Sequence, residues 1–484
     1  MAQSKHTETV HPAPAGPSRR QLLTSFGAGF GLLGLAGVLA DDGMLRAAEP
    51  AGSSGVNLNP LAPKKPHFAP TAQHVVHFFL TGGPSQIDTF DPKPMLDRLH
   101  GKPAGNLGLP TERKTGAVMR SPFTFRRYGE SGIPVSDLFK KTGEVIDDIC
   151  VVRSMYCDVP NHEPSILLLT CGHNVVTRPS WGAWATYGLG SENQNLPGYF
   201  ALCPNGRPTF GARLWGSSFL PGAYQGTFLE TKHQDIDRLI ENVRNTSFSS
   251  LGQRRQLDLV RRLNELHRET RPADSRLEAR IQSFELASRM QLDASDVLDV
   301  NQEPQHIHEL YGSGPHARQM IIARRMIERG VRFVQVFTHP SGGWDSHENL
   351  ENAHRRLATD ADQPLYAFLT DLKQRGLLDS TLVIVGGEFG RTPVAELPKL
   401  SGRDHNHYGF SFLLAGGGIR GGHIHGATDD LGFAAIEDRV HYHDLHATIL
   451  HCLGLDHQKL TFRFAGRDFR LTDVHGSVVH DILA

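Results

Sequence analysis

Carboxylate and imidazole side chains gather after apolar segments in the second half of the chain. These groups are the ligands that zinc and comparable divalent ions use in proteins. They are Asp345 and His347 after residues 331–337, Glu388 after residues 381–385, and Asp404, His405 and His407 before residues 410–415. In an open α/β sheet the crevice at the carboxyl ends of the strands is where ligands bind, so these loops are expected to share one site. The sequence therefore predicts a metal-dependent site.

The elements that position these residues alternate between apolar strand and amphipathic helix. Strands are predicted at residues 74–80, 149–153, 331–337, 381–385 and 410–415, with helices at 163–170, 316–329 and 352–375. Such alternation indicates a mostly parallel sheet. Residues 235–298 show apolar residues at helical spacing with charged faces, which predicts a helical insertion over about residues 235–315. The expected fold is a three-layer αβα sandwich.

Length and charge limit the class of protein. A chain of 484 residues exceeds the usual ceiling of about 250–300 residues for one simple core, so it needs a large α/β domain with insertions or two domains. Its 50 Lys and Arg balance 51 Asp and Glu, and no basic block indicates nucleic acid or an anionic membrane surface. The five cysteines are too few and scattered for a disulfide framework. One bridge, from Cys150 or Cys157 to Cys171, is the alternative to buried thiols.

The first 40 residues have the layout of a twin-arginine export signal. Arg19 and Arg20 precede an apolar stretch from Leu22 to Ala40. Cleavage near residue 40 is expected, with an uncleaved anchor as the alternative. Residues 41–72, rich in Pro, Ala and Ser in their second half, are assigned to a linker, and residues 73–484 to the folded body. The mature protein is therefore expected in the periplasm or outside the cell, without a membrane span.

Several motifs resemble a known family. GGPSQIDTFDPKP, NHEPS, GGWDSH, GGEFGRTP, GRDHNHYGF, LLAGGGIRGG and HYHDLHATILHCLGL resemble the exported family called domain of unknown function 1501. The resemblance extends from about residue 73 to the end of the chain. The order of strand exits also resembles the alkaline phosphatase superfamily, including sulfatases. This wider resemblance implies an alkaline phosphatase/sulfatase-like sandwich and ester hydrolysis with a divalent cation, which is Zn, Ca, Mn or Mg.

The resemblance also assigns roles to individual residues. Asp345 and His347 resemble the pair that holds one metal in the phosphatases, and His405 resembles a late histidine ligand. The implied ligands are Asp88, Asp345, His347, Glu388 and His405. The sequence departs from the superfamily at Glu388-Phe389, where the phosphatases have an Asp-His pair. The phenylalanine cannot bind a metal.

The sequence lacks the superfamily's nucleophile motifs. Asp158 stands where nucleotide pyrophosphatases have a threonine, and the Cys-x-Pro-x-Arg pattern of formylglycine sulfatases is missing. A metal-bound hydroxide is one alternative nucleophile. Ser165, activated by His162 at a helix start, is the other. Arg391 is a candidate for neutralising charge that develops on the substrate.

Each candidate also has a purely structural interpretation. The alternatives are a capped loop for Asp345 and His347, an ion pair for Glu388 and Arg391, a hydrogen-bonded pair for Asp404 and His405, a turn for Asp88, and a polar loop contact for His162. Residues 441–446 are rich in histidine, which a solvated loop explains, with Asp444 as the cap of a helix at 445–453.

Two classes of function follow. The favoured one is a metal-dependent hydrolase of sulfate or phosphate esters that acts outside the cytoplasm on a small-molecule or glycan ester. The other is a catalytically inactive protein of the same fold that binds a glycan or a partner protein at the cell surface, which the missing nucleophile motif favours. An isomerase resembling phosphoglycerate mutase is disfavoured because its substrates are cytoplasmic.

Overall fold

The computed structural model describes residues 59–103, 105, 108–233, 236–239, 250–269, 296–398 and 401–484. The predicted export signal and residues 41–58 of the expected linker lie outside this part. Residues 59–72 pack against the folded body, where Leu61 is buried and the backbone N–H groups of Thr71 and Ala72 donate to the carbonyl of Cys452. Residues 59–72, which the sequence assigns to the linker, thus make packing and hydrogen-bond contacts with the rest of the described structure.

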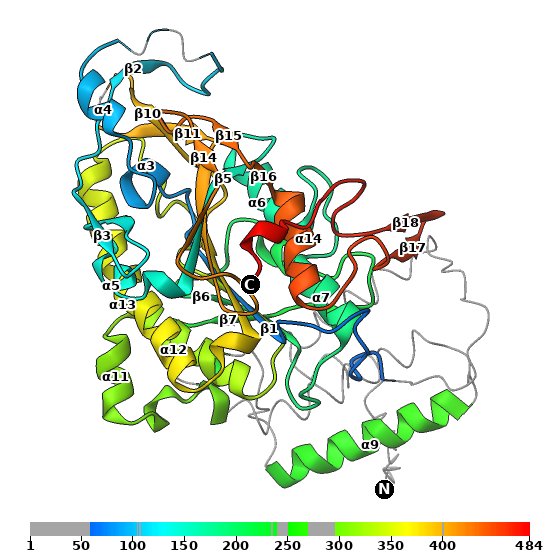
Figure 1. Cartoon of the computed structure of the whole chain (residues 1–484). Coiled ribbons are helices and arrows are strands. Elements are labelled where there is room, and N and C mark those ends of the chain that lie inside the picture. Colours follow the sequence, from blue (N-terminus) through cyan, green and yellow to red (C-terminus); the bar gives the residue numbers. More distant parts are fainter. Residues whose placement is uncertain are drawn as a thin grey trace, which may run out of the picture.

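A nine-stranded mixed sheet forms the centre of the described structure (Figure 1). Neighbouring strands are parallel except β12, which runs antiparallel to both of its neighbours. The mostly parallel sheet expected from the sequence is confirmed. The spatial order is β13 (His423–His425), β5 (Ile149–Tyr156), β12 (Phe410–Ala415), β9 (Thr381–Gly386), β1 (His74–Phe79), β8 (Phe333–Phe337), β6 (Tyr199–Cys203) and β7 (Thr227–Glu230), and β16 (Val440–His441) also pairs with β5.

Helices cover both faces of this sheet, so the three-layer αβα sandwich is confirmed (Figure 1). Every residue of β1 and β9 is buried, as a parallel sheet covered on both faces requires. One layer contains α5 (Lys140–Gly143), α11 (Gln305–Tyr311), α12 (Pro315–Glu328) and α13 (Leu350–Gln374). The other contains α6 (His162–Cys171), α7 (Trp181–Leu189) and α14 (Tyr442–Cys452).

Helices also occupy the described parts of the predicted insertion, as α8 (Ile236–Leu239), α9 (Ser250–Glu269) and η4 (Val300–Gln302). The remaining helical elements are α3 (Gln86–Thr89), α4 (Pro94–Leu99), η1 (Ile146–Asp148), η2 (Gly211–Leu214), η3 (Gly222–Tyr224), η5 (Leu378–Ser380) and η6 (His480–Ile482). Small antiparallel pairs are formed by β3 (Phe125–Tyr128) with β4 (Ile133–Ser136), β14 (Ala427–Thr428) with β15 (Ala435–Glu437), and β17 (Phe462–Phe464) with β18 (Arg467–Phe469).

A separate three-stranded sheet, which the sequence did not predict, lies beside the central one. It contains β11 (Arg403–Asn406), β10 (Gly390–Glu396) and β2 (Thr115–Val118) in that order. Its strands are short and carry many polar residues, so they lack the apolar alternation by which strands are recognised. This sheet carries several of the polar side chains that the sequence assigns to loops.

The start of α14 differs from the prediction. The helix begins at Tyr442, and the imidazole of His441 caps it by accepting from the backbone N–H of His443. Asp444 lies inside the first turn and accepts from the backbone N–H of His441, which completes a capping box. The prediction that Asp444 caps the helix was therefore wrong by about one turn. The actual cap is His441, because a neutral imidazole nitrogen can accept a hydrogen bond.

All five cysteines are buried, and none is bonded to another. The interpretation as buried thiols is confirmed, and the bridge to Cys171 is not formed. Within the described ranges, no helix combines the length and apolar character needed to cross a membrane.

His77 should make the stability of the fold sensitive to acid. It lies fully buried on β1 with neither ring nitrogen hydrogen-bonded, and burial lowers its pKa to about 3. In the unfolded chain its pKa returns to about 6.5. Unfolding therefore takes up a proton between these two values, and stability falls as the pH drops. His77→Phe should reduce the slope of unfolding free energy against pH by about 1.4 kcal/mol per pH unit near pH 5.

Urea denaturation across pH 4–7 measures this slope. His306→Phe is the matched control, because His306 is exposed on α11 and should leave the slope unchanged. Equal slopes for His77→Phe and the unaltered protein would contradict the assignment.

A candidate metal centre

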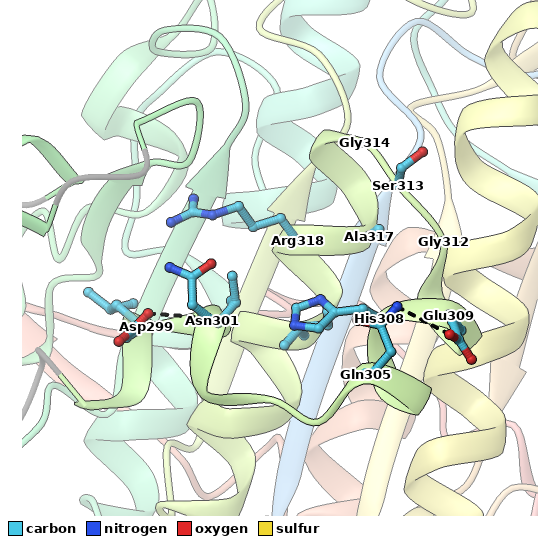
Figure 2. Close-up of a pocket in the computed structure, with 13 residues that line it drawn as sticks. Asp299, Asn301, Gln305, His308, Glu309, Gly312, Ser313, Gly314, Ala317 and Arg318 are labelled. Atoms are coloured by element: carbon cyan, nitrogen blue, oxygen red, sulfur yellow. Dashed lines mark hydrogen bonds between the residues drawn. The ribbon is translucent and has the colours of Figure 1, made fainter.

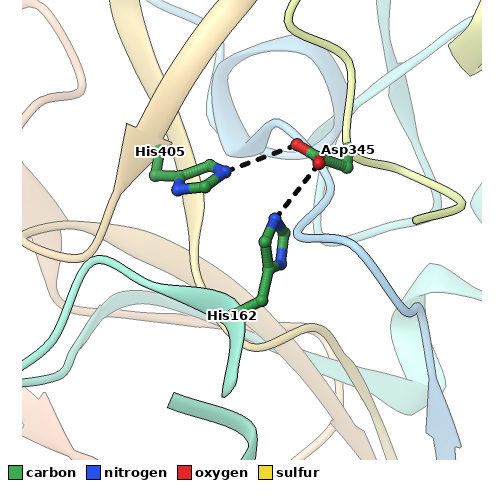
Figure 3. A group of neighbouring side chains, drawn as sticks. All are labelled: His162, Asp345 and His405. Atoms are coloured by element: carbon green, nitrogen blue, oxygen red, sulfur yellow. Dashed lines mark hydrogen bonds and ion pairs between the residues drawn. The ribbon is translucent and has the colours of Figure 1, made fainter. Parts of the chain in front are cut away.

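Three histidines direct their Nε2 atoms at the carboxylate of Asp345. His162 Nε2 lies 3.2 Å from Oδ2, while His347 Nε2 and His405 Nε2 lie 2.9 and 3.4 Å from Oδ1. The two latter nitrogens are 3.1 Å from each other. Figure 3 shows His162 and His405 both pointing at Asp345. Imidazoles from three separate segments of the chain thus converge on one carboxylate.

Each of these histidines places its other ring nitrogen, Nδ1, against a glutamate. The pairs are His162 with Glu388 at 2.6 Å, His347 with Glu396 at 2.5 Å, and His405 with Glu112 at 2.6 Å. Histidines that bind metals almost always use their second nitrogen in this way, which fixes the ring orientation and makes Nε2 a better ligand. The pattern occurs three times around one carboxylate.

The positions of these residues follow from the fold. Asp345 and His347 lie in the turn after β8, Glu388 follows β9, and His162 is the first residue of α6 after β5. These turns meet at the carboxyl edge of the central sheet, as predicted from the sequence. The small sheet contributes Glu396 at the end of β10 and the ring of His405 from β11.

Gly82 allows the turns after β1, β8 and β9 to touch. Its φ is +108°, and a Cβ at this position would lie 1.8 Å from the carbonyl oxygen of Gly342. The N–H of Gly82 donates to both carboxylate oxygens of Glu388 at 3.0 Å. Glu388 is therefore fixed by the backbone on one side and by His162 on the other.

Arg391 fixes the carboxylate of Asp345 by an ion pair. Its guanidinium is fully buried and donates to Asp345 Oδ1 at 2.7 Å, to the carbonyl of Gly83 at 2.9 Å and to the carbonyl of Gly82. A further bond goes to the carbonyl of Arg403. The partner of Arg391 is therefore Asp345, and these contacts indicate a positioning role more than contact with a substrate.

The structure does not bring two of the candidates, Asp88 and Ser165, to the centre. Both oxygens of Asp88 accept from Arg403, at 2.8 and 3.2 Å, in a fully buried ion pair. Ser165 is buried within α6, and its hydroxyl donates to the carbonyl of Glu388 at 2.5 Å. The geometry favours structural roles for both side chains.

The neighbours of His405 in the sequence have structural contacts. Asp404 accepts from the N–H of His405 at 2.9 Å and from the N–H of Arg113 at 2.6 Å. His407 is half-buried and packs on the ring of Tyr408. The hydrogen-bonded pair of Asp404 with His405 thus exists, although through the backbone, and it leaves the His405 ring free to face Asp345.

The charges of the centre shift its titration. Burial by itself raises the pKa of Asp345, but the three histidines and Arg391 hold that pKa far below its usual range. Burial lowers the pKa of His162, yet the carboxylates of Asp345 and Glu388 raise it to about 9. For His405, burial dominates and lowers the pKa. Of His162 and His405, His162 is therefore the imidazole that favours a positive charge.

Three observations test whether a cation fits here. His162 Nε2 is buried and, although 3.2 Å from Asp345, makes no hydrogen bond of acceptable geometry. Negative charge also exceeds fixed positive charge, since the surroundings contain five carboxylates, those of Glu112, Asp345, Glu388, Glu396 and Asp404, and two guanidinium groups, those of Arg113 and Arg391. Donor atoms of His162, Asp345 and His405 all lie within 4.8 Å of one another. The residues fit a divalent cation.

Sequence reasoning missed Glu112 and Glu396, and it gave His162 the role of activating Ser165. Glu112 lies 293 residues before its partner His405, and Glu396 lies 49 residues after His347. Neither glutamate follows an apolar strand of the central sheet. Only His162 had a local signal in the sequence that could have placed it at the site: it stands next to Glu163 at the start of a predicted helix.

A larger cavity of about 410 Å³ lies between residues 298–301, α11 and the start of α12 (Figure 2). Arg318, Asn301 and His308 line it, and none of the residues of the metal centre does. The cavity beside the metal centre is a different one and is described below.

The fold and the side-chain cluster define an α/β protein with a candidate metal centre. The family model described as "Protein of unknown function (DUF1501)" matches residues 72–483, so the chain belongs to this family. The resemblance stated from the motifs is confirmed. Among curated proteins, none matches this chain.

Similar solved structures include a sulfatase and an alkaline phosphatase. PsFucS1 sulfatase from Pseudoalteromonas sp. is 12% identical, with 81% of this chain and 68% of that chain covered and a TM-score of 0.33. A mutant TAB5 alkaline phosphatase with bound Mg is 10% identical, with 80% and 99% covered and a TM-score of 0.34. The lipoteichoic acid synthase LtaP from Listeria monocytogenes is 9% identical, with 86% and 79% covered and a TM-score of 0.34.

The glutamates behind the histidines should control metal affinity. Glu396→Gln replaces a carboxylate that orients His347 Nδ1 with a neutral amide, which weakens the imidazole as a ligand. We expect zinc affinity to fall about 10- to 100-fold, and a similar loss for Glu112→Gln. Competition with a chromophoric chelator measures the affinity. Glu437→Gln, an exposed site on β15, is the control, and unchanged affinity in both test variants would show that these glutamates do not support a metal.

Proposed function

We propose that the protein is an exported metal-dependent hydrolase of phosphate or sulfate monoesters. The observation that carries the proposal is the convergence of three imidazole Nε2 atoms on Asp345, each imidazole being held by a glutamate at Nδ1. Buried charges of this kind are costly unless they are paired or bind a cation. The arrangement is typical of a metal centre.

The ligands in this proposal are His162, His347, His405 and Asp345. Three imidazoles and one carboxylate suit zinc better than calcium or magnesium, which prefer oxygen ligands. Manganese remains compatible with a mixed set. Of the ligands expected from the sequence, Asp345, His347 and His405 are retained, His162 is added, and Glu388 acts as the group that orients it.

When bound, the divalent cation supplies a water of lowered pKa and a positive charge beside the ester oxygen. The protein's own residues prepare the site for it. His162 must release the proton on Nε2 to become a ligand, while Glu388 keeps the Nδ1 proton in place. Arg391 holds the Asp345 carboxylate in place through their ion pair. The centre of the Phe389 ring lies 4.6 Å from the centre of the His405 ring and 4.8 Å from that of the His162 ring. Phe389 therefore excludes water from one side of the site.

The described side chains near the centre favour attack by water over attack by a protein nucleophile. Ser165 donates its hydroxyl proton to the carbonyl of Glu388. Burial raises the pKa of the neighbouring Cys157 thiol to about 12, so it is not a thiolate at neutral pH. The amino end of α6 begins at His162, and its dipole favours an anionic ester near the centre.

The proposed location is the periplasm or the outside of the cell, reached through the twin-arginine segment of residues 1–40. This route carries folded proteins, which suits an enzyme whose metal ligands come from distant parts of the chain. The proposed substrate is a monoester of a small molecule or a glycan.

Metal content and hydrolysis test the proposal together. The protein should contain about one equivalent of zinc or manganese and hydrolyse at least one ester in a panel of phosphate and sulfate monoesters. Asp345→Asn keeps the shape but removes the charge at the centre, so metal should be lost and kcat/KM should fall about 1,000-fold. Elemental analysis and steady-state kinetics measure both.

Asp360→Asn, an exposed change on α13, is the matched control and should leave metal and activity unaltered. Full retention of metal in Asp345→Asn would contradict the ligand assignment. Stoichiometric metal without hydrolysis of any ester would instead favour the alternative function, a protein of this fold that binds a glycan or a partner.

A further inference from the structure

A mostly apolar cavity of about 230 Å³ opens directly beside the metal centre. His162, Asp345 and Glu388 form one end of it. The apolar lining consists mainly of Phe79, Ile166, Phe210, Leu214 and Phe337. The cavity exceeds the roughly 150 Å³ of an engineered apolar cavity that holds benzene, so it has room for a ring with substituents.

The walls of this cavity are fixed by the fold. Phe79 and Phe337 are the last residues of β1 and β8 and are fully buried, and Leu214 is buried at the end of η2. The loop that carries Phe210 is tied to the turn after β8, because Thr209 donates its backbone N–H to the carbonyl of Pro340 at 3.0 Å. The cavity therefore exists without rearrangement.

The polar groups of the lining are poorly suited to a sugar. The hydroxyls of Thr81 and Thr209 donate to the carbonyls of His339 and Pro340. No Lys or Arg belongs to the lining, whose charged groups besides His162 are the carboxylates of Glu163, Asp345 and Glu388. Recognition of sugar hydroxyls needs several free donors and acceptors, and a polysulfated glycan would meet repulsion from these carboxylates.

We infer that the cavity binds the organic group of the ester and selects a neutral, apolar one, such as an aryl or branched alkyl group. This inference rests on the proposed function, because the ester must reach the metal centre at His162 and Asp345. It narrows the substrate class from small-molecule or glycan esters to monoesters of apolar alcohols or phenols. Apolar surface removed from water provides the selectivity.

Binding of non-hydrolysable analogues to the zinc-loaded full chain tests the inference independently of catalysis. Isothermal titration calorimetry would compare benzylphosphonate with methylphosphonate and benzylsulfonate with methylsulfonate. The sugar compound is 6-deoxy-6-sulfogalactose, a sulfonate whose carbon–sulfur bond is not hydrolysed. We expect the benzyl compounds to bind at least about 10-fold more tightly than their methyl counterparts, since six additional carbons enter the cavity. The sugar sulfonate should bind no more tightly than the methyl compounds.

Two variants locate the effect. Ile166→Trp fills the cavity, and Phe210→Ser makes its partly exposed wall polar; each should reduce the benzyl preference to within about 3-fold while methyl binding is kept. Ile436→Trp is the control, because Ile436 is 58% exposed on β15, outside the cavity lining. Circular dichroism verifies that each variant is folded.

Equal binding of benzyl and methyl compounds, or tighter binding of the sugar sulfonate, would overturn the inference even if ester hydrolysis is confirmed. A benzyl preference that persists in both Ile166→Trp and Phe210→Ser would also overturn it. Failure of the proposed function has a different result: no ester is hydrolysed, whereas the benzyl preference and its loss in the variants remain.

Discussion

The carboxylate of Asp345 is the constraint on which the rest of the site depends. It is partly buried where burial alone would raise its pKa, yet Arg391 and three histidines keep it ionised. A carboxylate in such a place needs compensating positive charge, and the surrounding groups are arranged to supply it. Each histidine is in turn held by a glutamate, so the negative charge around the cluster grows with every supporting contact. One divalent cation would balance this excess of negative charge. For this reason the geometry favours a metal centre.

The fold makes this concentration of charge sustainable. Strands β1, β8 and β9 are buried on both faces and end together, and only a glycine at position 82 lets their turns approach closely enough for its N–H to hold Glu388. The small sheet then closes the site from the side with Glu396 and His405. Packing rigidity matters here, because a metal centre tolerates little displacement of its ligands. The apolar ends of β1 and β8 also form the neighbouring cavity, so the same strand ends that place the charges shape the space for an organic group.

Much of this arrangement could be predicted from the sequence, for a physical reason. Apolar strands that alternate with helices specify a parallel sheet, and polar residues after such strands must meet at its edge. This rule places Asp345, His347 and Glu388 together. His405 was recognised from its position just before a strand. Residues without that local context could not be placed. Glu112 and Glu396 reach the site through a polar segment and a short antiparallel strand that carry no periodic signal. Asp88 and Ser165 were plausible by type, but Asp88 neutralises the buried Arg403 and Ser165 satisfies the carbonyl of Glu388. Which polar side chain pairs with which buried partner is decided by tertiary packing, and a single sequence does not contain that information.

X-ray absorption spectroscopy of the zinc-loaded protein tests the central claim most directly. The account predicts a first coordination sphere of nitrogen and oxygen atoms at about 2.0–2.1 Å, with the multiple-scattering pattern of three imidazoles and no sulfur. A sphere made only of water and carboxylate oxygens, a zinc–sulfur distance near 2.3 Å, or fewer than two imidazoles would contradict it.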